Sequence, residues 1–244
     1  MSTRKAFDRG ARHYDLLVTL NPGYHQHLRA AAAELIERVG RDRPRRLLDL
    51  ACGTGASTRA LLQAVPEGSR IEGVDQSAGM LARARTKPWP STVTFHEGAL
   101  GALDPGAVET GARDGALAAY LYRNVPEAQR DSALRETYEL LAPGGWLVVQ
   151  EYSVAQAGSP TPWHPARRWS LVCWLIIIPL GLLVGRDTVL YRYLWRSVLA
   201  FDSPERFRER LAEAGFTDVS TRSVPGWQRG ILHTFRARRP EGST

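Results

Sequence analysis

The sequence predicts an α/β fold, in which a mostly parallel sheet is covered by helices on both faces. Three observations predict it. Short apolar runs alternate with segments of helical periodicity along the chain. Glycines follow the first run, in Leu48-Asp49-Leu50-Ala51-Cys52-Gly53-Thr54-Gly55, and a carboxylate, Asp75, ends the second. Ligands of such folds bind at the carboxyl ends of the strands, so we expect the glycines and Asp75 to face one pocket.

The apolar pattern places seven strands and their helices along the chain. The expected strands span residues 47–51, 71–75, 93–96, 116–121, 146–150, 216–221 and 231–237. The expected helices are 25–39, one through 60–64 capped by Ser57 or Thr58, one through 80–84 capped by Ser77, 127–141 before Ala142-Pro143-Gly144-Gly145, and 204–214 closed by Gly215.

We expect residues 1–244 to form a single domain with four parts. Residues 1–40 form N-terminal lid helices, 45–152 the cofactor-binding core, 159–200 an apolar insertion that faces substrate or membrane, and 204–239 a C-terminal helix and strands. The insertion follows the fifth strand.

Composition is that of an ordinary globular enzyme, with 43% hydrophobic and 23% charged residues. The net charge of +7 is compatible with nucleic acid, with an anionic membrane surface or with a coding preference for arginine; Lys5 and Lys87 are the only lysines, so the coding preference explains part of the excess. Cys52 and Cys173 are not expected to pair, and no secretion signal is visible at the amino terminus. We therefore expect a cytoplasmic protein.

The glycine turn favours one nucleoside cofactor over another. The third glycine of a dinucleotide-binding turn is missing, because Thr58 stands in its place. Asp49 precedes the glycines; its charge would repel a diphosphate and attract the ammonium of a methionine moiety. Asp75, at the end of the second strand, can accept hydrogen bonds from ribose hydroxyls. These residues favour S-adenosylmethionine over NAD.

Further motifs extend across nearly the whole chain: LDLACGTG, GVDQSAGML, YRNV at Tyr122 to Val125, LAPGGWLVVQEYS, and YRYLWRSVLAF before AGF at Ala214 to Phe216. The set resembles the ubiquinone and menaquinone biosynthesis C-methyltransferases, within the class I S-adenosylmethionine-dependent methyltransferases. The resemblance implies a Rossmann-like seven-stranded sheet with an antiparallel last strand, and methyl transfer to a carbon of a prenylated quinol.

The motif and the resemblance together predict the cofactor contacts. These residues lie at the tips of the first four strands: Asp49, Ala51, Gly53, Thr54, Gly55, Thr58, Asp75, Gln76, Met80, Gly98, Ala99, Leu100 and Ala119. The chain departs from the family at two of them. Ala99 replaces the acid of a Gly-Asp-Ala motif, and Ala119 replaces a small polar residue. Glu97 can compensate for Ala99 only if the register of its strand differs.

Three residues are candidates for the chemistry. Arg123 and Asn124 follow the fourth strand, where a cation and an amide can lower the pKa of a quinol hydroxyl and orient the ring. The alternative for Arg123 is a structural ion pair with Asp49 or Glu151. Tyr14 can bond the methionine carboxylate of the cofactor, or serve only as a packed aromatic.

Histidines offer a base at His25 or His164, although surface or core roles are commoner for histidine. No metal-ligand spacing is present, since His25 and His27 fall on different faces of a helix, and we expect no metal.

The insertion carries the information about the substrate. An uncharged stretch of about 17 residues lies between Arg168 and Arg186, which is marginal for a bilayer span. Pro179, Gly181 and Gly185 are expected to break it. A spanning helix, an interfacial or substrate-tunnel helix, and a plain core segment all remain open. The arginines and tryptophans around the stretch are typical of an anionic lipid interface, which favours a peripheral membrane enzyme with a lipid-soluble acceptor.

Three functions remain in view from the sequence. The first is C-methylation of a prenylated quinol, and the second is methylation of another apolar molecule such as a phenolic or polyketide metabolite. The third, a nucleic-acid methyltransferase, is disfavoured because Tyr120 to Asn124 do not match the Asn-Pro-Pro-Tyr type of tetrapeptide that grips a flipped base. We expect a hydrophobic small-molecule substrate and no nucleic acid.

Overall fold

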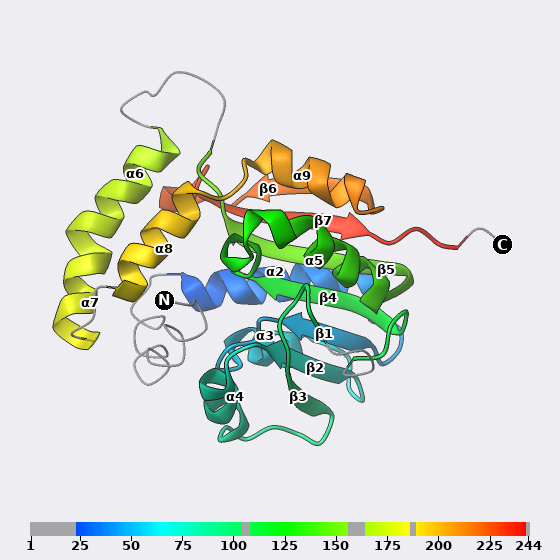
Figure 1. Cartoon of the computed structure of the whole chain (residues 1–244). Helices are drawn as coiled ribbons and strands as arrows, with labels where there is room; N and C mark the ends of the chain where they lie inside the picture. The colour runs from blue at the N-terminus through cyan, green and yellow to red at the C-terminus, as the bar shows by residue number, and fades with distance from the viewer. Residues whose placement is uncertain (1–22, 104–107, 156–163, 186–188, 243–244) are drawn as a thin grey trace.

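One seven-stranded sheet forms the centre of the computed structural model, which describes residues 23–103, 108–155, 164–185 and 189–242 (Figure 1). The strands are β1 (Arg46–Leu50), β2 (Arg70–Asp75), β3 (Val93–Glu97), β4 (Arg113–Ala119), β5 (Leu141–Tyr152), β6 (Thr217–Ser223) and β7 (Leu232–Arg238). The helices of the main body are α2 (Tyr24–Val39), α3 (Ala56–Ala64), α4 (Ala78–Arg85), α5 (Glu127–Leu140) and α9 (Pro204–Glu213). Tyr14 and most of the expected lid, residues 1–22, lie outside the described residues.

The strand order is β3-β2-β1-β4-β5-β7-β6. The five strands β1 to β5 run parallel, and β7 pairs antiparallel with both β5 and β6. This confirms the expected α/β class and the antiparallel last strand. The order reverses between β1 and β4, so their carboxyl ends form the switch point where ligands of open α/β sheets bind.

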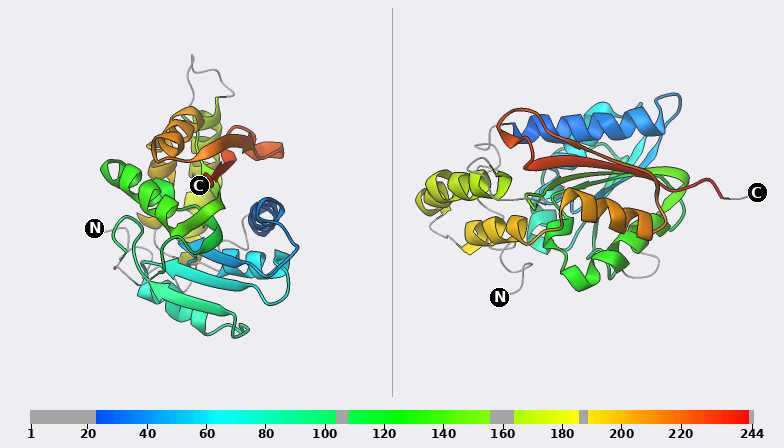
Figure 2. Two further views of the ribbon diagram at one scale, coloured as in Figure 1. Left: turned by 90° about the vertical axis from the view of Figure 1, so that its right-hand side faces the viewer. Right: turned by 90° about the horizontal axis from the view of Figure 1, so that it is seen from above.

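Two apolar clusters cover the two faces of the sheet. Neighbouring residues of one strand face opposite ways, so that Leu47 packs in the cluster with α2 and α3, and Leu48 in the cluster with α5 and α9. Figure 2 shows these helices on the two sides of the strands. The inner residues of β1 and β4 are buried on both faces, and apart from Asp49 the segments 47–50 and 115–119 are apolar or glycine, which is why the strands could be recognised.

The start of α3 differs from the prediction. Neither Ser57 nor Thr58 caps the helix: Gly55 is the N-cap residue, with a left-handed φ of +89° and no side-chain cap. The two hydroxyl groups lie inside the first turn and donate instead to Asp49. The predicted cap of α4 is confirmed, since Ser77 Oγ accepts from Met80 N at 3.2 Å.

The predicted fourth strand was placed too late along the chain. β4 begins at Arg113 and ends at Ala119, so Tyr120 and Leu121 lie beyond it. Tyr120 still donates its backbone N–H to Gln150 at 2.8 Å, but its φ is +59°, and the chain turns away from the sheet there.

The insertion after β5 is helical, with α6 (Pro165–Val172), a π-helical turn at Cys173–Ile177, α7 (Ile178–Gly185) and α8 (Val189–Leu199). The prediction that Pro179 and Gly181 break the apolar stretch is wrong, because helix continues across both residues and ends at Gly185. Ile178 N–H donates to Cys173 C=O, five residues back, and this wider turn accommodates the proline that follows. Within the described residues, no helix is both long enough and apolar enough to cross a bilayer.

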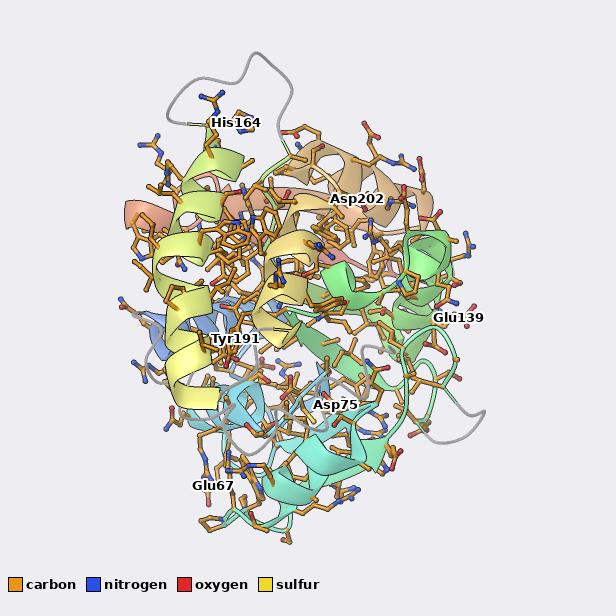
Figure 3. The ribbon with its side chains drawn as sticks, turned by 60° about the vertical axis from the view of Figure 1, so that its left-hand side comes forward. Glu67, Asp75, Glu139, His164, Tyr191 and Asp202 are labelled. Atoms are coloured by element: carbon orange, nitrogen blue, oxygen red, sulfur yellow. The ribbon has the colours of Figure 1, made fainter. Side chains whose placement is uncertain are left out.

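Gly181 lets the ring of Tyr191 on α8 pack against the backbone of α7. A Cβ at this position would lie 2.2 Å from Cδ2 of Tyr191, whose ring is buried between the helices. Figure 3 shows Tyr191 at these helices, with Asp75 at the neighbouring edge of the sheet. The absence of a side chain at position 181 therefore sets the spacing inside the insertion.

We predict that Gly181→Ala destabilises the insertion by about 1–3 kcal/mol, the usual cost of forcing an extra carbon into a packed site. Limited proteolysis should show faster cleavage between residues 164 and 200, and thermal unfolding should move to lower temperature. Gly242→Ala is the matched control, since a Cβ there meets nothing within 4 Å. Equal protease resistance of the two variants would contradict the packing argument.

Candidate active site

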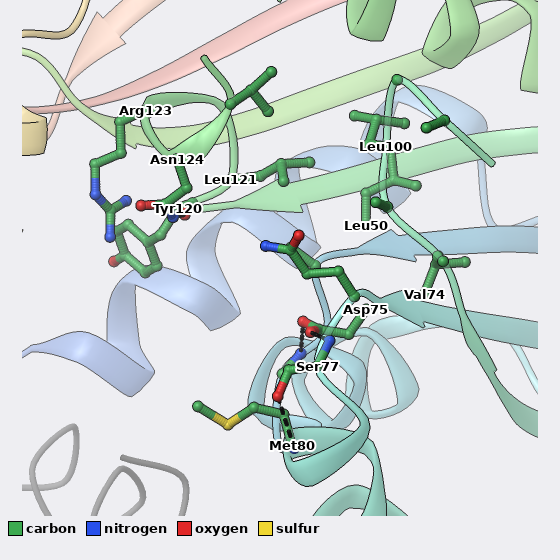
Figure 4. A pocket seen from close by; sticks show the side chains of 18 of the residues that line it. Leu50, Val74, Asp75, Ser77, Met80, Leu100, Tyr120, Leu121, Arg123 and Asn124 are labelled. Carbon is green, nitrogen blue, oxygen red and sulfur yellow. Dashed lines mark hydrogen bonds between the residues drawn. The ribbon is translucent and has the colours of Figure 1, made fainter. Parts of the chain in front are cut away.

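A pocket opens at the carboxyl ends of β1, β2 and β4, at the switch point of the sheet. Its walls combine apolar side chains with a few converging polar groups, which is typical of small-molecule sites. In Figure 4, Asp75, Ser77 and Met80 lie on one side, and Tyr120, Arg123 and Asn124 on the other. The lining residues are Leu50, Ala51, Gly53, Val74, Asp75, Gln76, Ser77, Met80, Gly98, Ala99, Leu100, Gly101, Ala102, Ala119, Tyr120, Leu121, Arg123, Asn124, Val125, Pro126 and Gln129.

Asp75 holds two loops together at the floor of the pocket. Its Oδ2 accepts the backbone N–H of Gly53 at 2.8 Å, and its Oδ1 accepts that of Ser77, also at 2.8 Å. Gly53 has a φ of +55°, and a Cβ there would meet nothing within 4 Å. The glycine turn thus presents bare backbone to the pocket, which allows a ligand to approach closely.

Two residues that are not glycine adopt left-handed backbones at this edge. Ala51 follows β1 with a φ of +60°, and Tyr120 follows β4 with a φ of +59°. Such conformations cost free energy, and they persist only where the surrounding structure enforces them. Both residues line the pocket.

Asp49 is fully buried behind the glycine turn. Its Oδ2 accepts the hydroxyl groups of Ser57 at 2.8 Å and of Thr58 at 2.5 Å. Its Oδ1 has no hydrogen-bond partner among the described residues. Burial raises the pKa of this carboxyl group to about 7, although the two hydroxyl groups lower it. A cationic group close to this buried carboxylate would be stabilised strongly, because one carboxylate oxygen has no hydrogen-bond partner among the described residues.

The structure places nine of the thirteen predicted cofactor residues in the lining of the pocket: Ala51, Gly53, Asp75, Gln76, Met80, Gly98, Ala99, Leu100 and Ala119. The other four, Asp49, Thr54, Gly55 and Thr58, do not line it. Gly55 is the N-cap residue of α3, and Thr58 donates a hydrogen bond to Asp49, so these two residues support the glycine turn without facing the pocket.

Glu97 does not take the place of the acid that Ala99 lacks. It pairs in register with Asp75, ends β3, and is exposed outside the pocket. The register is the regular one, so the condition under which Glu97 could compensate is not met. Gln129, from the first turn of α5, is a polar side chain that lines the same pocket.

Arg123 and Asn124 lie on the opposite wall. Arg123 Nη1 donates to Glu151 Oε1 at 2.6 Å, and the backbone N–H of Arg123 donates to Glu151 Oε2 at 3.3 Å. Glu151 is fully buried. Of the two acids considered as structural partners for Arg123, Glu151 is the one that it contacts. Asn124 donates Nδ2–H to the Tyr120 carbonyl at 2.8 Å and accepts from the Tyr193 hydroxyl at 3.2 Å.

A row of aromatic rings runs from α2 to the insertion beneath Arg123. Tyr120 stacks between Tyr24 and Tyr152 at centroid distances of 5.4 and 5.3 Å, and Tyr152 lies 5.0 Å from Trp169 of α6. The guanidinium carbon of Arg123 is 5.5 Å from the centroid of Tyr120. The aromatic row and the bond from Tyr193 together connect the insertion to the pocket wall.

The two histidines considered as bases are not in the pocket lining. His25 is exposed on the first turn of α2, and His164 caps α6 by accepting the N–H of Ala166 on Nδ1 at 3.3 Å. No group of three or more histidine, cysteine or acidic residues within the described ranges is arranged to hold a metal ion.

Sequence reasoning missed several wall residues, among them Leu50, Val74, Tyr120 and Gln129. Leu50 and Val74 stand at or next to the ends of strands that had been assigned, so their positions at the strand tips were a usable signal. Tyr120 was hidden because it was included in the strand, and Gln129 because nothing in a helical sequence shows which first-turn side chain faces a neighbouring loop.

Comparison with protein families and curated proteins gives a consistent result. A model described as the ubiE/COQ5 methyltransferase family matches residues 2–236. The chain is 33% identical over 220 residues to a ubiquinone/menaquinone biosynthesis C-methyltransferase of Methylobacterium nodulans, covering 88% of this chain and 83% of the relative. It is 36% identical to a demethylmenaquinone methyltransferase of Thermus thermophilus, over 86% of this chain and 91% of the relative.

Solved structures agree on the fold. A methyltransferase of Thermotoga maritima, described as S-adenosylmethionine-dependent, superposes with a TM-score of 0.62 at 17% identity, over 96% of this chain and 97% of that one. Phosphoethanolamine N-methyltransferase 2 of Haemonchus contortus, in complex with S-adenosylmethionine, has a TM-score of 0.58 at 15% identity, over 86% and 52%. The sheet, the pocket and the matched family model together establish that this chain belongs to the ubiE/COQ5 family of S-adenosylmethionine-dependent methyltransferases.

Proposed function

We propose that this enzyme methylates a ring carbon of a prenylated quinol of the demethylmenaquinol type, acting in the cytoplasm. The observation that carries the proposal is that the apolar insertion contacts the pocket wall directly: Tyr193 of α8 bonds Asn124, and Trp169 of α6 extends the aromatic row that includes Tyr120. An acceptor with a polar ring and a long apolar tail needs these two environments side by side. The named substrates of the relatives support the same class.

The residues of the pocket fit S-adenosylmethionine, which supplies an activated methyl group. Asp75 ends β2 at the floor of the pocket, where a carboxylate would accept hydrogen bonds from ribose hydroxyls. Leu50, Val74 and Leu100 offer an apolar surface for the adenine. Asp49 does not line the pocket, but its carboxylate lies behind the glycine turn, from where its charge would attract the ammonium group.

Arg123 and Asn124 would act on the acceptor. Ionisation of a quinol hydroxyl places negative charge on the neighbouring ring carbon, so a donor aimed at that oxygen favours the attack. Glu151 holds the guanidinium of Arg123 in place, and Tyr193 orients the amide of Asn124. The buried walls exclude water, and the reacting groups are brought into line by binding alone. Tyr14 stays a proposed contact to the methionine carboxylate.

The direct test incubates the full chain with methyl-labelled S-adenosylmethionine and two acceptor sets. One set holds demethylated prenyl quinols in detergent, and the other soluble phenols and a polyketide-type phenol. We expect label on a ring carbon of the prenyl quinols. Label confined to the soluble set would replace this proposal by the second candidate, a methyltransferase for another phenolic metabolite.

Asp75→Ala should weaken S-adenosylmethionine binding by about 1.5–3 kcal/mol, the range for a hydrogen bond to a charged group. Titration calorimetry measures the change. Glu97→Ala is the matched control, since it removes the carboxylate that stands beside Asp75 in the register but is outside the pocket. Equal affinities for the two variants would refute the role of Asp75.

Asp49 should make stability depend on pH in a specific direction. Its pKa is raised from about 3.8 to about 7 on folding, so the folded protein holds a proton that the unfolded chain releases between these values. The stabilisation is complete below pH 4 and is lost as the pH rises through 7. Relative to Asp49→Asn, the wild type without cofactor should therefore lose about 3 kcal/mol of unfolding free energy between pH 5 and pH 8.

Denaturant unfolding of both proteins at the two pH values measures this difference. Saturating S-adenosylmethionine should reduce the loss, because a cation beside the carboxylate favours its ionised form. A difference that does not change with pH would show that Asp49 ionises normally.

Arg123→Lys should slow single-turnover methylation about 10–100-fold and leave cofactor affinity unchanged. Lysine keeps a positive charge beside the buried Glu151, so the fold should survive, but it lacks the planar fork of the guanidinium. Rapid-quench kinetics with calorimetry separate the two effects. A folded lysine variant with the wild-type rate would give Arg123 a structural role only.

A further inference from the structure

The outer side of the insertion carries an apolar surface that no described part of the chain covers. We define the outer insertion face as Leu171, Trp174, Leu175, Ile176 and Leu182, each 46–67% exposed. Of the seven most exposed large hydrophobic side chains in the described residues, these are five. Isolated exposed hydrophobic residues are ordinary, but a contiguous group on neighbouring helical turns indicates a binding surface.

The π-helical turn explains why the surface is broad. In a turn of this kind the residues four and five positions along the chain both lie near the starting one, so Leu175 and Ile176 share a side with Leu171. Cys173, in the same turn, is fully buried and faces the body of the protein. The turn therefore keeps Leu175 and Ile176 on the outer side while Cys173 stays buried.

Positive charge surrounds this apolar surface. Arg167, Arg192 and Arg196 are exposed on α6 and α8, and the guanidinium carbon of Arg192 lies 5.8 Å from the ring centroid of Trp174. The sequence from 164 to 200 holds five arginines and a single acid, Asp187. Apolar side chains, tryptophan and arginine together are the composition that binds the boundary between headgroups and acyl chains of an anionic bilayer.

We infer that the outer insertion face docks on the surface of an anionic membrane, with its five apolar side chains inserted among the lipid headgroups. A second copy of the chain fits less well, because a symmetric contact would bring the arginines of both copies together with little acid to offset them. Since no described helix is able to cross a bilayer, the contact is a surface one.

The docking also orients the active site. Trp169, on the same helix as Leu171, meets the aromatic row, and Tyr193, on the neighbouring α8, meets Asn124. Figure 1 shows α6 and α7 at the far end of the molecule, with α8 between them and the sheet. The idea that the membrane delivers a lipid acceptor to this end of the molecule rests on the proposed function.

The test is sedimentation of the full chain with phosphatidylcholine vesicles, with and without 30% phosphatidylglycerol. We expect binding to the anionic vesicles that weakens as salt is added. Two double variants test the face: Leu175→Ser with Ile176→Ser, and Arg192→Glu with Arg196→Glu. Each should lower the partition coefficient at least tenfold, the first by removing inserted apolar side chains and the second because each arginine contributes about fivefold. All four side chains are exposed, so the variants should fold, which S-adenosylmethionine binding verifies.

Arg135→Glu combined with Arg208→Glu is the matched control. It makes the same change in net charge on exposed positions of α5 and α9, which cover a face of the sheet. A control that loses as much binding as the Arg192 and Arg196 pair would reduce the effect to overall charge and overturn the inference. The inference would also be overturned if the Leu175→Ser and Ile176→Ser variant bound vesicles as well as the wild type. A wild type that forms a dimer, binds no vesicles and becomes monomeric in this variant would overturn it too.

A soluble demethylated quinol without a prenyl tail separates this inference from the proposed function. The docking variants should methylate it at the wild-type rate, while their rate on a prenyl quinol in vesicles falls. If the wild type binds vesicles but methylates neither quinol, the proposed substrate is wrong and the membrane contact stands.

Discussion

The carboxylate of Asp75 is the constraint on which the geometry of the pocket depends. It accepts N–H groups from the turn after β1 and from the turn after its own strand, and so fixes two neighbouring strand tips relative to each other. A carboxylate is suited to this task because its two oxygens can each accept a backbone N–H from a different loop.

The opposite wall is organised by a buried ion pair and stacked rings. Glu151 is in the last residues of β5 and Arg123 is just beyond β4, so their contact joins adjacent strands of the sheet at its carboxyl edge. The rings beneath continue into the insertion through Trp169. The insertion is therefore attached to the site by packing and hydrogen bonds: α8 contacts Asn124 through Tyr193, and α6 is linked to Tyr120 through Tyr152.

The fold and the strand-tip positions of the pocket were predictable because they depend on local pattern. Apolar strand runs, the glycine turn and an acid at a strand tip are all visible in sequence, and nine of the predicted cofactor residues line the pocket. The failures came where tertiary contacts override local preference. Ser57 and Thr58 are good capping residues, yet the buried Asp49 takes their hydroxyl groups. Pro179 is a helix breaker, yet a π-helical turn before it absorbs the disruption. The partner of Arg123 was left open between two acids, since distance in space cannot be obtained from spacing in the chain.

The left-handed backbones of Ala51 and Tyr120 bear on the order in which the molecule assembles. Neither residue has a local preference for that conformation, so the rim of the pocket forms only where pairing of β1 with β4, and of β4 with β5, enforces it. β4 is far along the chain from the glycine turn. A fragment that ends after β3 would contain the most recognisable motif of the family and still lack a formed binding site, so affinity for the nucleoside cofactor should arise late, as a property of the completed sheet.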